Sequence, residues 1–224
     1  MRSTPSLNSQ DPFRMALGKL RGQLRDGDYV LGEPLPIVDL ARGMGLSATP
    51  IREALARLAG EGLIEDRRGR GYFAWRFDVA DLVELYALNL LHLTGALDIA
   101  LARKAVGGSP RELAQEALDA MLAGLGPAQG LAAFSEHLFD RVIAEGGNRA
   151  LMGAYRAISD RLGPARRVEA EVIEGMADEV ANLAALFDAA DRTGLRDALR
   201  GFHGRRREEA GSIVGAMRAR RAFQ

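Results

Sequence analysis

The fold of the first part of this chain is decided by one stretch, Leu46-Ser47-Ala48-Thr49-Pro50-Ile51-Arg52-Glu53-Ala54-Leu55-Ala56-Arg57-Leu58. Ser47 is a good N-cap, because its hydroxyl can accept a hydrogen bond from a backbone N–H that lacks a helical partner. Pro50 falls in the first turn, where its missing N–H costs nothing. Apolar residues then recur every three or four positions, which predicts a helix that ends near Gly62 and buries Ile51, Ala54, Leu55 and Leu58.

Two further helices are expected before this one. A first begins at Pro12, stops at Asp26-Gly27-Asp28, and has an apolar face of Phe13, Leu17, Leu20 and Leu24. A short extended segment, residues 29–31, precedes a second helix over residues 37–44, which Gly45 closes. The second and third helices, joined by a tight glycine-containing turn, predict a helix-turn-helix. We also expect Glu53 and Arg57 to pair across the outer face of the third helix.

Short strands are predicted over residues 63–65 and 72–75, around the turn Arg67–Gly71. They add a wing, so residues 12–77 are expected to form a winged helix-turn-helix. Residues 1–11 are rich in Ser, Pro and Asn without apolar periodicity and predict a flexible arm.

Beyond residue 77 the pattern changes to one helical stripe after another. The first stripe consists of Leu82, Leu85, Tyr86, Asn89, Leu93, Ala96 and Leu97. Breaks are expected at residues 107–110, 124–130, 146–148 and 163–164, with the last two helices over about 177–193 and 195–219. Residues 78–224 therefore predict an all-α antiparallel bundle of six or seven helices, and the chain as a whole is mainly α.

Composition excludes several classes of protein. The 224 residues include no cysteine, so disulfides, thiolate metal sites and cysteine nucleophiles are ruled out. The N-terminus lacks the apolar core of a signal peptide. The apolar stretch Leu82–Ala102 contains Glu84, Asn89, His92 and Asp98, too many polar groups for a membrane span. We therefore expect a cytoplasmic protein without a membrane partner.

The net charge is zero, which at first argues against a nucleic-acid partner. The charge is unevenly divided, however: residues 1–77 carry 12 Lys and Arg against nine acids, a balance of +3, and the remainder carries −3. Arg67-Arg68-Gly69-Arg70 concentrates three cations in the wing turn. By itself such a run is most often a solvated turn.

Several motifs together resemble the GntR-type regulators. The residues that carry this resemblance are Leu35-Pro36, Asp39-Leu40-Ala41, the stretch from Gly45 to Leu58, and Glu61-Gly62-Leu63-Ile64. The following bundle is similar to the FCD effector domain of the FadR subfamily in length, helix number and the pair Gly147-Asn148. The resemblance implies a homodimeric bacterial regulator, with repression the expected mode, that binds a palindromic double-stranded DNA operator.

The resemblance also assigns residues to DNA. In such proteins the N-terminal residues of the third helix enter the major groove, which implicates Ser47, Thr49, Pro50 and Arg52. The wing tip approaches the minor groove and implicates Arg68, Gly69 and Arg70. Ala48 and Val38 occupy positions where some relatives carry a contacting Arg, which predicts a different operator sequence.

Many FCD domains hold a divalent metal with one Asp and three His. The corresponding positions here are Ser135, Phe139, about Val180 and about Phe202, none of which offers an acid or an imidazole. His137 is two positions from an expected ligand and points away from it on a helix. His203 is one position from an expected ligand and is the sole exception. We therefore expect no metal and no other cofactor.

The same substitutions leave a more apolar core. Asn89 stands where relatives often place an Arg that meets an effector carboxylate. The pattern predicts a pocket for an uncharged or apolar-tailed effector of unknown identity, lined by Asn89, Ser135, Phe139, Val180 and Phe202. The alternative is that this region is ordinary core, which would make the protein a constitutive dimeric DNA-binding regulator.

An enzyme is disfavoured. The sequence has no phosphate-binding glycine loop, no His-x-x-x-His and no acid pair placed with a base. Glu136, Asp140 and Glu145 are expected to form one solvent-exposed face of a helix.

Overall fold

The computed structural model describes residues 11–29, 31–104 and 127–220. The chain divides into two compact units, residues 1–76 and 77–224. All but Asp11 of the arm expected over residues 1–11 lies outside the described residues, as do the expected break at residues 107–110 and the first part of the break expected at residues 124–130. The remainder of that break, residues 127–130, is helical, so this part of the prediction is wrong.

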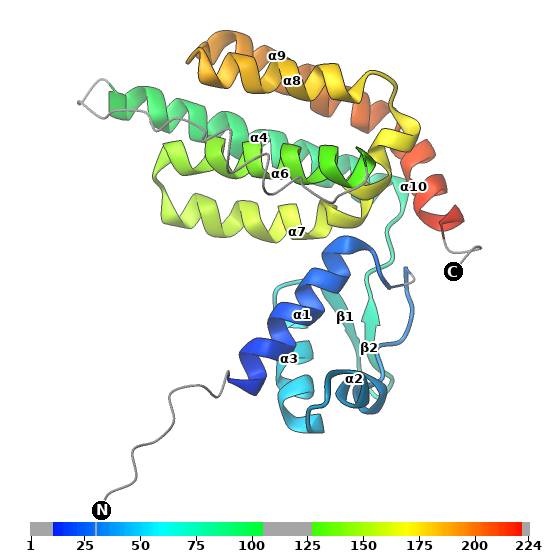
Figure 1. Ribbon diagram of the computed structural model, residues 1–224. Coiled ribbons are helices and arrows are strands. Elements are labelled where there is room, and N and C mark those ends of the chain that lie inside the picture. Colours follow the sequence, from blue (N-terminus) through cyan, green and yellow to red (C-terminus); the bar gives the residue numbers. More distant parts are fainter. Residues whose placement is uncertain (1–10, 30, 105–126, 221–224) are drawn as a thin grey trace, which may run out of the picture. The chain divides into compact units, whose positions relative to one another are not determined.

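The N-terminal unit is a winged helix-turn-helix, as expected (Figure 1). Its elements are α1 (Pro12–Asp26), α2 (Ile37–Met44), α3 (Ala48–Gly60), β1 (Ile64–Arg67) and β2 (Gly71–Ala74). The predicted stripe of α3, Ile51, Ala54, Leu55 and Leu58, is fully buried. It packs against Ala16 and Leu20 of α1 in one apolar core.

Local signals explain where these helices begin and end. Asp11 caps α1 by accepting a hydrogen bond from the backbone N–H of Phe13. Gly27 and Gly45 end α1 and α2 in the left-handed conformation that glycine adopts most readily. Ser47 occupies the N-cap position of α3, but its hydroxyl makes no capping hydrogen bond, so that part of the prediction is wrong.

The wing is an antiparallel pair in which Ile64 lies opposite Ala74 and Arg67 opposite Gly71. The extended segment expected at residues 29–31 is not a strand: Tyr29 lies in a bend and Leu31 in a turn. The backbone that pairs with β2 comes just after it. Gly32, with a φ of +80°, turns the chain so that residues 32–35 exchange backbone hydrogen bonds of 2.8–3.0 Å with residues 72–74.

The C-terminal unit is an all-α bundle with six helices in its described residues (Figure 1). They are α4 (Val79–Lys104), α6 (Pro127–Gly146), α7 (Arg149–Val172), α8 (Met176–Asp188), α9 (Arg192–Glu208) and α10 (Ala210–Ala219). Helix α4 packs against α6, α7 and α9, and its whole predicted stripe from Leu82 to Leu97 is buried. Helix α4 is long and apolar enough to cross a membrane, but a core helix of a helical bundle passes the same test. The buried stripe of α4 fits such a core helix.

Other expected boundaries in the bundle are also wrong. Gly163 and Pro164 do not end a helix, because α7 continues through them to Val172. An interior proline costs a helix about 3 kcal/mol, but Leu162, Ala165 and Val168 on either side are buried, and this packing outweighs the cost. The single helix expected over residues 195–219 is divided at Glu209 into α9 and α10.

Candidate nucleic-acid interface and bundle core

The N-terminal end of α3 presents polar side chains to solvent. Ser47, Thr49 and Arg52 are exposed, and Pro50 is half-buried in the first turn. Because the Ser47 hydroxyl does not cap the helix, it is available to a ligand. The free backbone N–H groups and positive dipole end of a helix N-terminus favour phosphate at this place.

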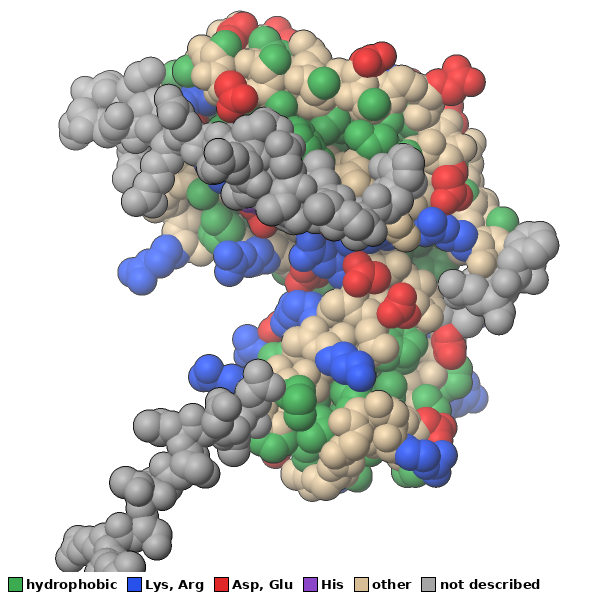
Figure 2. Space-filling model, in the orientation of Figure 1, with side chains coloured by type: hydrophobic (Ala, Val, Ile, Leu, Met, Phe, Trp, Pro, Cys, Tyr) green, Lys and Arg blue, Asp and Glu red, His purple; other side chains and the backbone are tan. Residues whose placement is uncertain are grey.

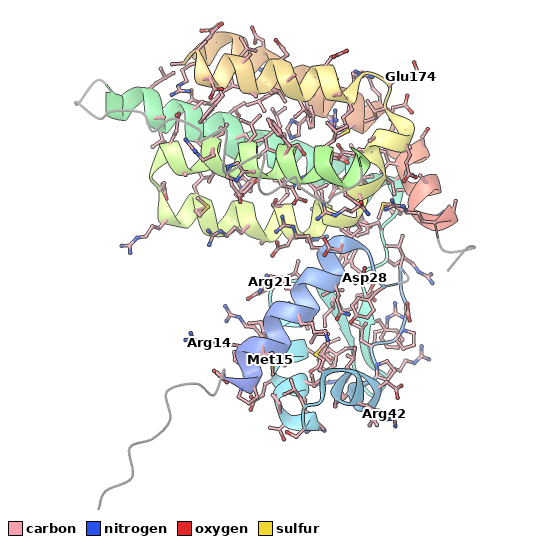
Figure 3. The ribbon with its side chains drawn as sticks, viewed as in Figure 1. Arg14, Met15, Arg21, Asp28, Arg42 and Glu174 are labelled. Atoms are coloured by element: carbon pink, nitrogen blue, oxygen red, sulfur yellow. The ribbon has the colours of Figure 1, made fainter. Side chains whose placement is uncertain are left out.

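Neighbouring arginines are held by partners within the protein. Arg57 does not pair with Glu53 as expected; its Nε donates to Oε1 of Glu61 at 2.6 Å. Glu61 also binds Arg21 of α1, which places its carboxylate where Arg57 reaches it. Arg21 projects from α1 in Figure 3. Arg67 donates to Glu65 at 2.8 Å, and its guanidinium lies 4.3 Å above the Phe73 ring.

The remaining wing arginines are exposed. Arg68 and Arg70 flank Gly69 at the tip, and Gly69 has a φ of +74°, a conformation that side chains rarely adopt. Across the described ranges, Arg52, Arg68 and Arg70 have no ion-pair partner. On the face of the N-terminal unit drawn in Figure 2, basic side chains are separated by apolar and acidic ones. The candidate interface therefore depends on a few placed arginines rather than on a continuous basic field.

The residues expected to line a pocket lie in the core of the bundle. Asn89, Ser135, Phe139, Val180 and Phe202 are each at most 4% exposed. The rings of Phe139 and Phe202 meet edge to face, with centroids 5.4 Å apart. Ser135 donates its hydroxyl proton to the carbonyl of Ala132, so it can only accept a hydrogen bond from a ligand.

His203 joins this aromatic group. Its ring lies 5.3 Å from Phe202 and 5.7 Å from Phe139. Nδ1 lies 2.8 Å from the carbonyl oxygen of Leu199, and Nε2 lies 2.9 Å from the side-chain amide of Asn89. Burial, together with the nearby positive charges of Arg206 and Arg166, lowers the pKa of His203 to about 3. The ring is therefore neutral at physiological pH.

The surroundings of His203 do not resemble a metal centre. Over the described parts of the chain, no three His, Asp or Glu side chains are grouped closely enough to hold an ion. Both His203 nitrogens already face protein groups, and Ser135, Phe139, Val180 and Phe202 offer no acid or imidazole side chain. These residues do not fit a divalent cation.

A buried ion pair lies beside the same aromatic group. Arg206, which has no exposed surface, donates from Nε to Oε2 of Glu169 at 2.7 Å and from Nη1 to Glu179 at 3.0 Å. Tyr86 donates to the other oxygen of Glu169 at 2.7 Å. Burial and the negative charge of Glu169 raise the pKa of Tyr86 well above its usual value. The guanidinium of Arg206 lies 3.1 Å from the centroid of the Phe202 ring.

The expected exposed face on α6 is largely absent. Glu136 is buried, with Oε1 3.7 Å from both Arg166 and Arg167. Glu145 is half-buried and pairs with Arg192 at 2.6 Å, and Asp140 alone is exposed. The carboxylates turn inward because α7 and α9 supply guanidinium groups to them.

The chain is similar to several known proteins. A family model described as "Bacterial regulatory proteins, gntR family" matches residues 14–73, the helix-turn-helix and its wing. Residues 14–73 are therefore similar to the DNA-binding domains of the gntR family. An HTH-type transcriptional regulator of Mycobacterium tuberculosis is 40% identical over 121 residues, which are 54% of this chain and 45% of that protein. The chain thus spans less than half of that relative's length.

A second curated relative and one solved structure are also similar to this chain. The Nta operon transcriptional regulator of Aminobacter aminovorans is 30% identical over 138 residues, 62% of this chain and 65% of that protein. The structure of E. coli McbR/YncC resembles the chain in fold, with a TM-score of 0.70 at 20% identity over 91% of this chain and 99% of that one. Both curated relatives are named as transcriptional regulators, the class of protein that the sequence predicted.

The exposed residues at the start of α3 and in the wing turn were predicted from the sequence. The buried charges of the bundle were not. A signal for them exists. Leu195, Leu199 and Phe202 form an apolar stripe, and Arg206 falls on the same stripe one turn later. Glu169 likewise follows Leu162 at a spacing of seven residues. A charged residue in phase with an apolar stripe indicates a buried partner.

Proposed function

We propose that this gntR-family protein is a DNA-binding transcriptional regulator that binds a palindromic operator as a homodimer, with repression the expected mode. Its bundle is inferred to be an FCD-like domain of the FadR type that carries the dimer interface and an effector site. The domain limits proposed are residues 12–77 for DNA binding and 78–224 for the bundle. A cytoplasmic location, without a membrane partner, follows from this role.

The observation that carries the proposal is the division of arginines in the N-terminal domain. Arg57 and Arg67 are bound to Glu61 and Glu65, whereas Arg52, Arg68 and Arg70 are exposed and free of ion pairs in the described residues. Arg52 at the start of a recognition helix has the reach for a guanine edge. Ser47 and Thr49 beside it can donate to phosphates or bases, with Pro50 setting the first turn. Arg68, Gly69 and Arg70 suit close approach to a minor groove.

An exposed apolar face supports the dimer. Leu88 and Leu91, 42% and 63% exposed, lie on the side of α4 opposite its buried stripe. A palindromic operator has two identical half-sites and therefore requires two identical DNA-binding domains. A dimer formed through a self-complementary surface has this two-fold symmetry. A second copy of this chain is the proposed occupant of this face.

For the bundle we propose an effector site at Asn89, Ser135, Phe139, Val180 and Phe202, with no metal and no other cofactor. What supports it is a buried polar pair, Asn89 and His203, that ordinary core does not require, with the rings of Phe139 and Phe202 beside His203. The second candidate is a constitutive dimeric regulator in which the same residues only pack.

A footprint tests the main proposal. DNA upstream of the protein's own gene is probed with the full chain at about 150 mM salt, and protection of two symmetric half-sites about one helical turn apart is expected. Candidate metabolites are then titrated, and release or tightening of the footprint separates the regulated from the constitutive form. Binding no tighter than to random duplex contradicts the proposal.

A further inference from the structure

We propose that the core of the bundle binds an uncharged small molecule whose hydrogen-bond donor and acceptor are adjacent, as in a primary carboxamide, held between Asn89 and Arg206. The inference rests on the effector site proposed above and names the chemical class of its ligand. It is carried by two fully buried side chains, each with a polar atom left without a partner.

The first of these atoms belongs to Asn89. A carbonyl oxygen only accepts, so Nδ1 of His203, 2.8 Å from the oxygen of Leu199, carries the ring proton. Nε2 of the neutral ring is then an acceptor, and the atom facing it must be a donor. Asn89 as placed turns Oδ1 toward Nε2 and leaves Nδ2 unpartnered. Rotation of the amide by 180° brings Nδ2 to His203 and puts Oδ1, an acceptor, in the buried place of Nδ2.

The second atom is Nη2 of Arg206. Its Nε binds Glu169, and its Nη1 binds Glu179 and the carbonyl of Phe202, but Nη2 has no hydrogen-bond partner among the described residues. Buried donors are nearly always paired in proteins, and this N–H can donate to a bound water or to the acceptor of a ligand.

Asn89 and Arg206 belong to one cluster of contacting side chains. His203, which contacts Asn89, lies one turn before Arg206 on α9. Tyr86, one turn before Asn89 on α4, binds the same Glu169 carboxylate as Arg206. Asn89 therefore offers an acceptor and Arg206 a donor from facing helices. A group such as –CO–NH₂ matches both.

Charge balance selects a neutral ligand. Three guanidinium groups and three carboxylates line this part of the core: Arg166, Arg167, Arg206, Glu136, Glu169 and Glu179. Arg205, which also binds Glu179, lies at the solvent-exposed edge. A carboxylate ligand would add an uncompensated negative charge beside Glu169 in a buried site, which is strongly unfavourable. The rings of Phe139 and Phe202 suit the apolar part of a neutral molecule.

Thermal unfolding of the full chain at pH 7.5 tests this inference with three probes of equal chain length: butanamide, butanoate and butan-2-one. At about 20 mM, butanamide is expected to raise the Tm by about 4 °C, and the other two by less than about 1 °C. Asn89→Leu is expected to abolish the shift, whereas Thr94→Val, on the same helix, retains it. Thr94 is the matched control because its hydroxyl bonds the backbone of its own helix.

A stabilisation by butanoate equal to that by butanamide, or no shift with butanamide, overturns the inference. If Asn89→Leu does not fold, NMR of the Asn89 side-chain amide in the unmodified protein replaces it. Butanamide is expected to move that signal, and an unmoved signal overturns the inference. The footprint without ligand is measured in parallel. Retained DNA binding with no amide response rejects the ligand class alone, whereas loss of specific DNA binding rejects the proposed function.

Discussion

Nε2 of His203 and the side-chain amide of Asn89 lie 2.9 Å apart in the core of the bundle, although 114 positions separate them in the sequence. The pair joins α4 to α9. Both ring nitrogens of His203 face protein groups, which explains why an imidazole is tolerated among the phenylalanine rings.

The first prediction concerns pH. The pKa of His203 is about 3 in the folded protein and near 6.5 in the unfolded chain, so the unfolded chain binds a proton first as pH falls. The His203 contribution is constant above pH 6.5, and between pH 6.5 and 3 it lowers the free energy of unfolding by about 1.4 kcal/mol per pH unit. Urea unfolding between pH 7.5 and 4.5 measures the free energy of unfolding as a function of pH. His203→Gln should reduce the slope of this dependence below pH 6.5 by about 1.4 kcal/mol per pH unit. An unchanged slope contradicts a buried neutral imidazole.

The second prediction concerns metals. Because the described residues contain no group of three His, Asp or Glu side chains that could hold an ion, EDTA and added Zn²⁺ or Ni²⁺ should leave the Tm of the full chain within about 1 °C. A large stabilisation that a chelator removes would contradict the metal-free core. His203→Gln then identifies whether that residue is a ligand.

The third prediction concerns the buried pair of Arg206 and Glu169. Arg206→Met leaves the Glu169 carboxylate buried without its guanidinium and should lower the free energy of unfolding by about 3–5 kcal/mol. Arg200 of the same helix pairs with Asp197 in solvent, with both side chains more than half exposed. Arg200→Met is therefore the matched control and should cost less than about 1 kcal/mol. Equal losses in urea unfolding would show that burial of the first pair has no energetic role.

The fourth prediction separates two arginines of α3. Arg52→Ala should weaken binding to the footprinted duplex by about 10- to 100-fold, since it removes a contact with a base edge. Arg57→Ala should change it less than about threefold, because Arg57 is bound to Glu61. Fluorescence anisotropy with both variants makes the comparison, and circular dichroism verifies that each is folded. The reverse order of effects would place the DNA on the other side of the helix.

The helix-turn-helix was predictable because its signals are local. Glycines mark the ends of α1 and α2, and the apolar spacing of α3 defines its buried face. The misplaced features depend on contacts distant in the sequence. Arg57 selects Glu61 over Glu53 because Arg21 of α1 already holds that carboxylate. Pro164 remains helical because neighbouring side chains are buried.

The bundle core shows the same division. Its pocket candidates were located by alignment with a family pattern, and they are all buried. The buried charges were missed, because a charged residue on a helix is by default solvated. Glu136, Glu169 and Arg206 are buried only because α6, α7, α8 and α9 bring opposite charges together. The charge division between the domains, +3 and −3, was visible from the sequence alone.

Sequence-specific DNA binding is the central claim, and one equilibrium measurement tests it most directly. The dissociation constants of the full chain for the footprinted duplex and for a scrambled duplex of the same composition are compared at about 150 mM salt. We predict a ratio of at least about 1,000 in favour of the footprinted duplex, with two chains bound per duplex. Equal affinity for the two duplexes would contradict the account.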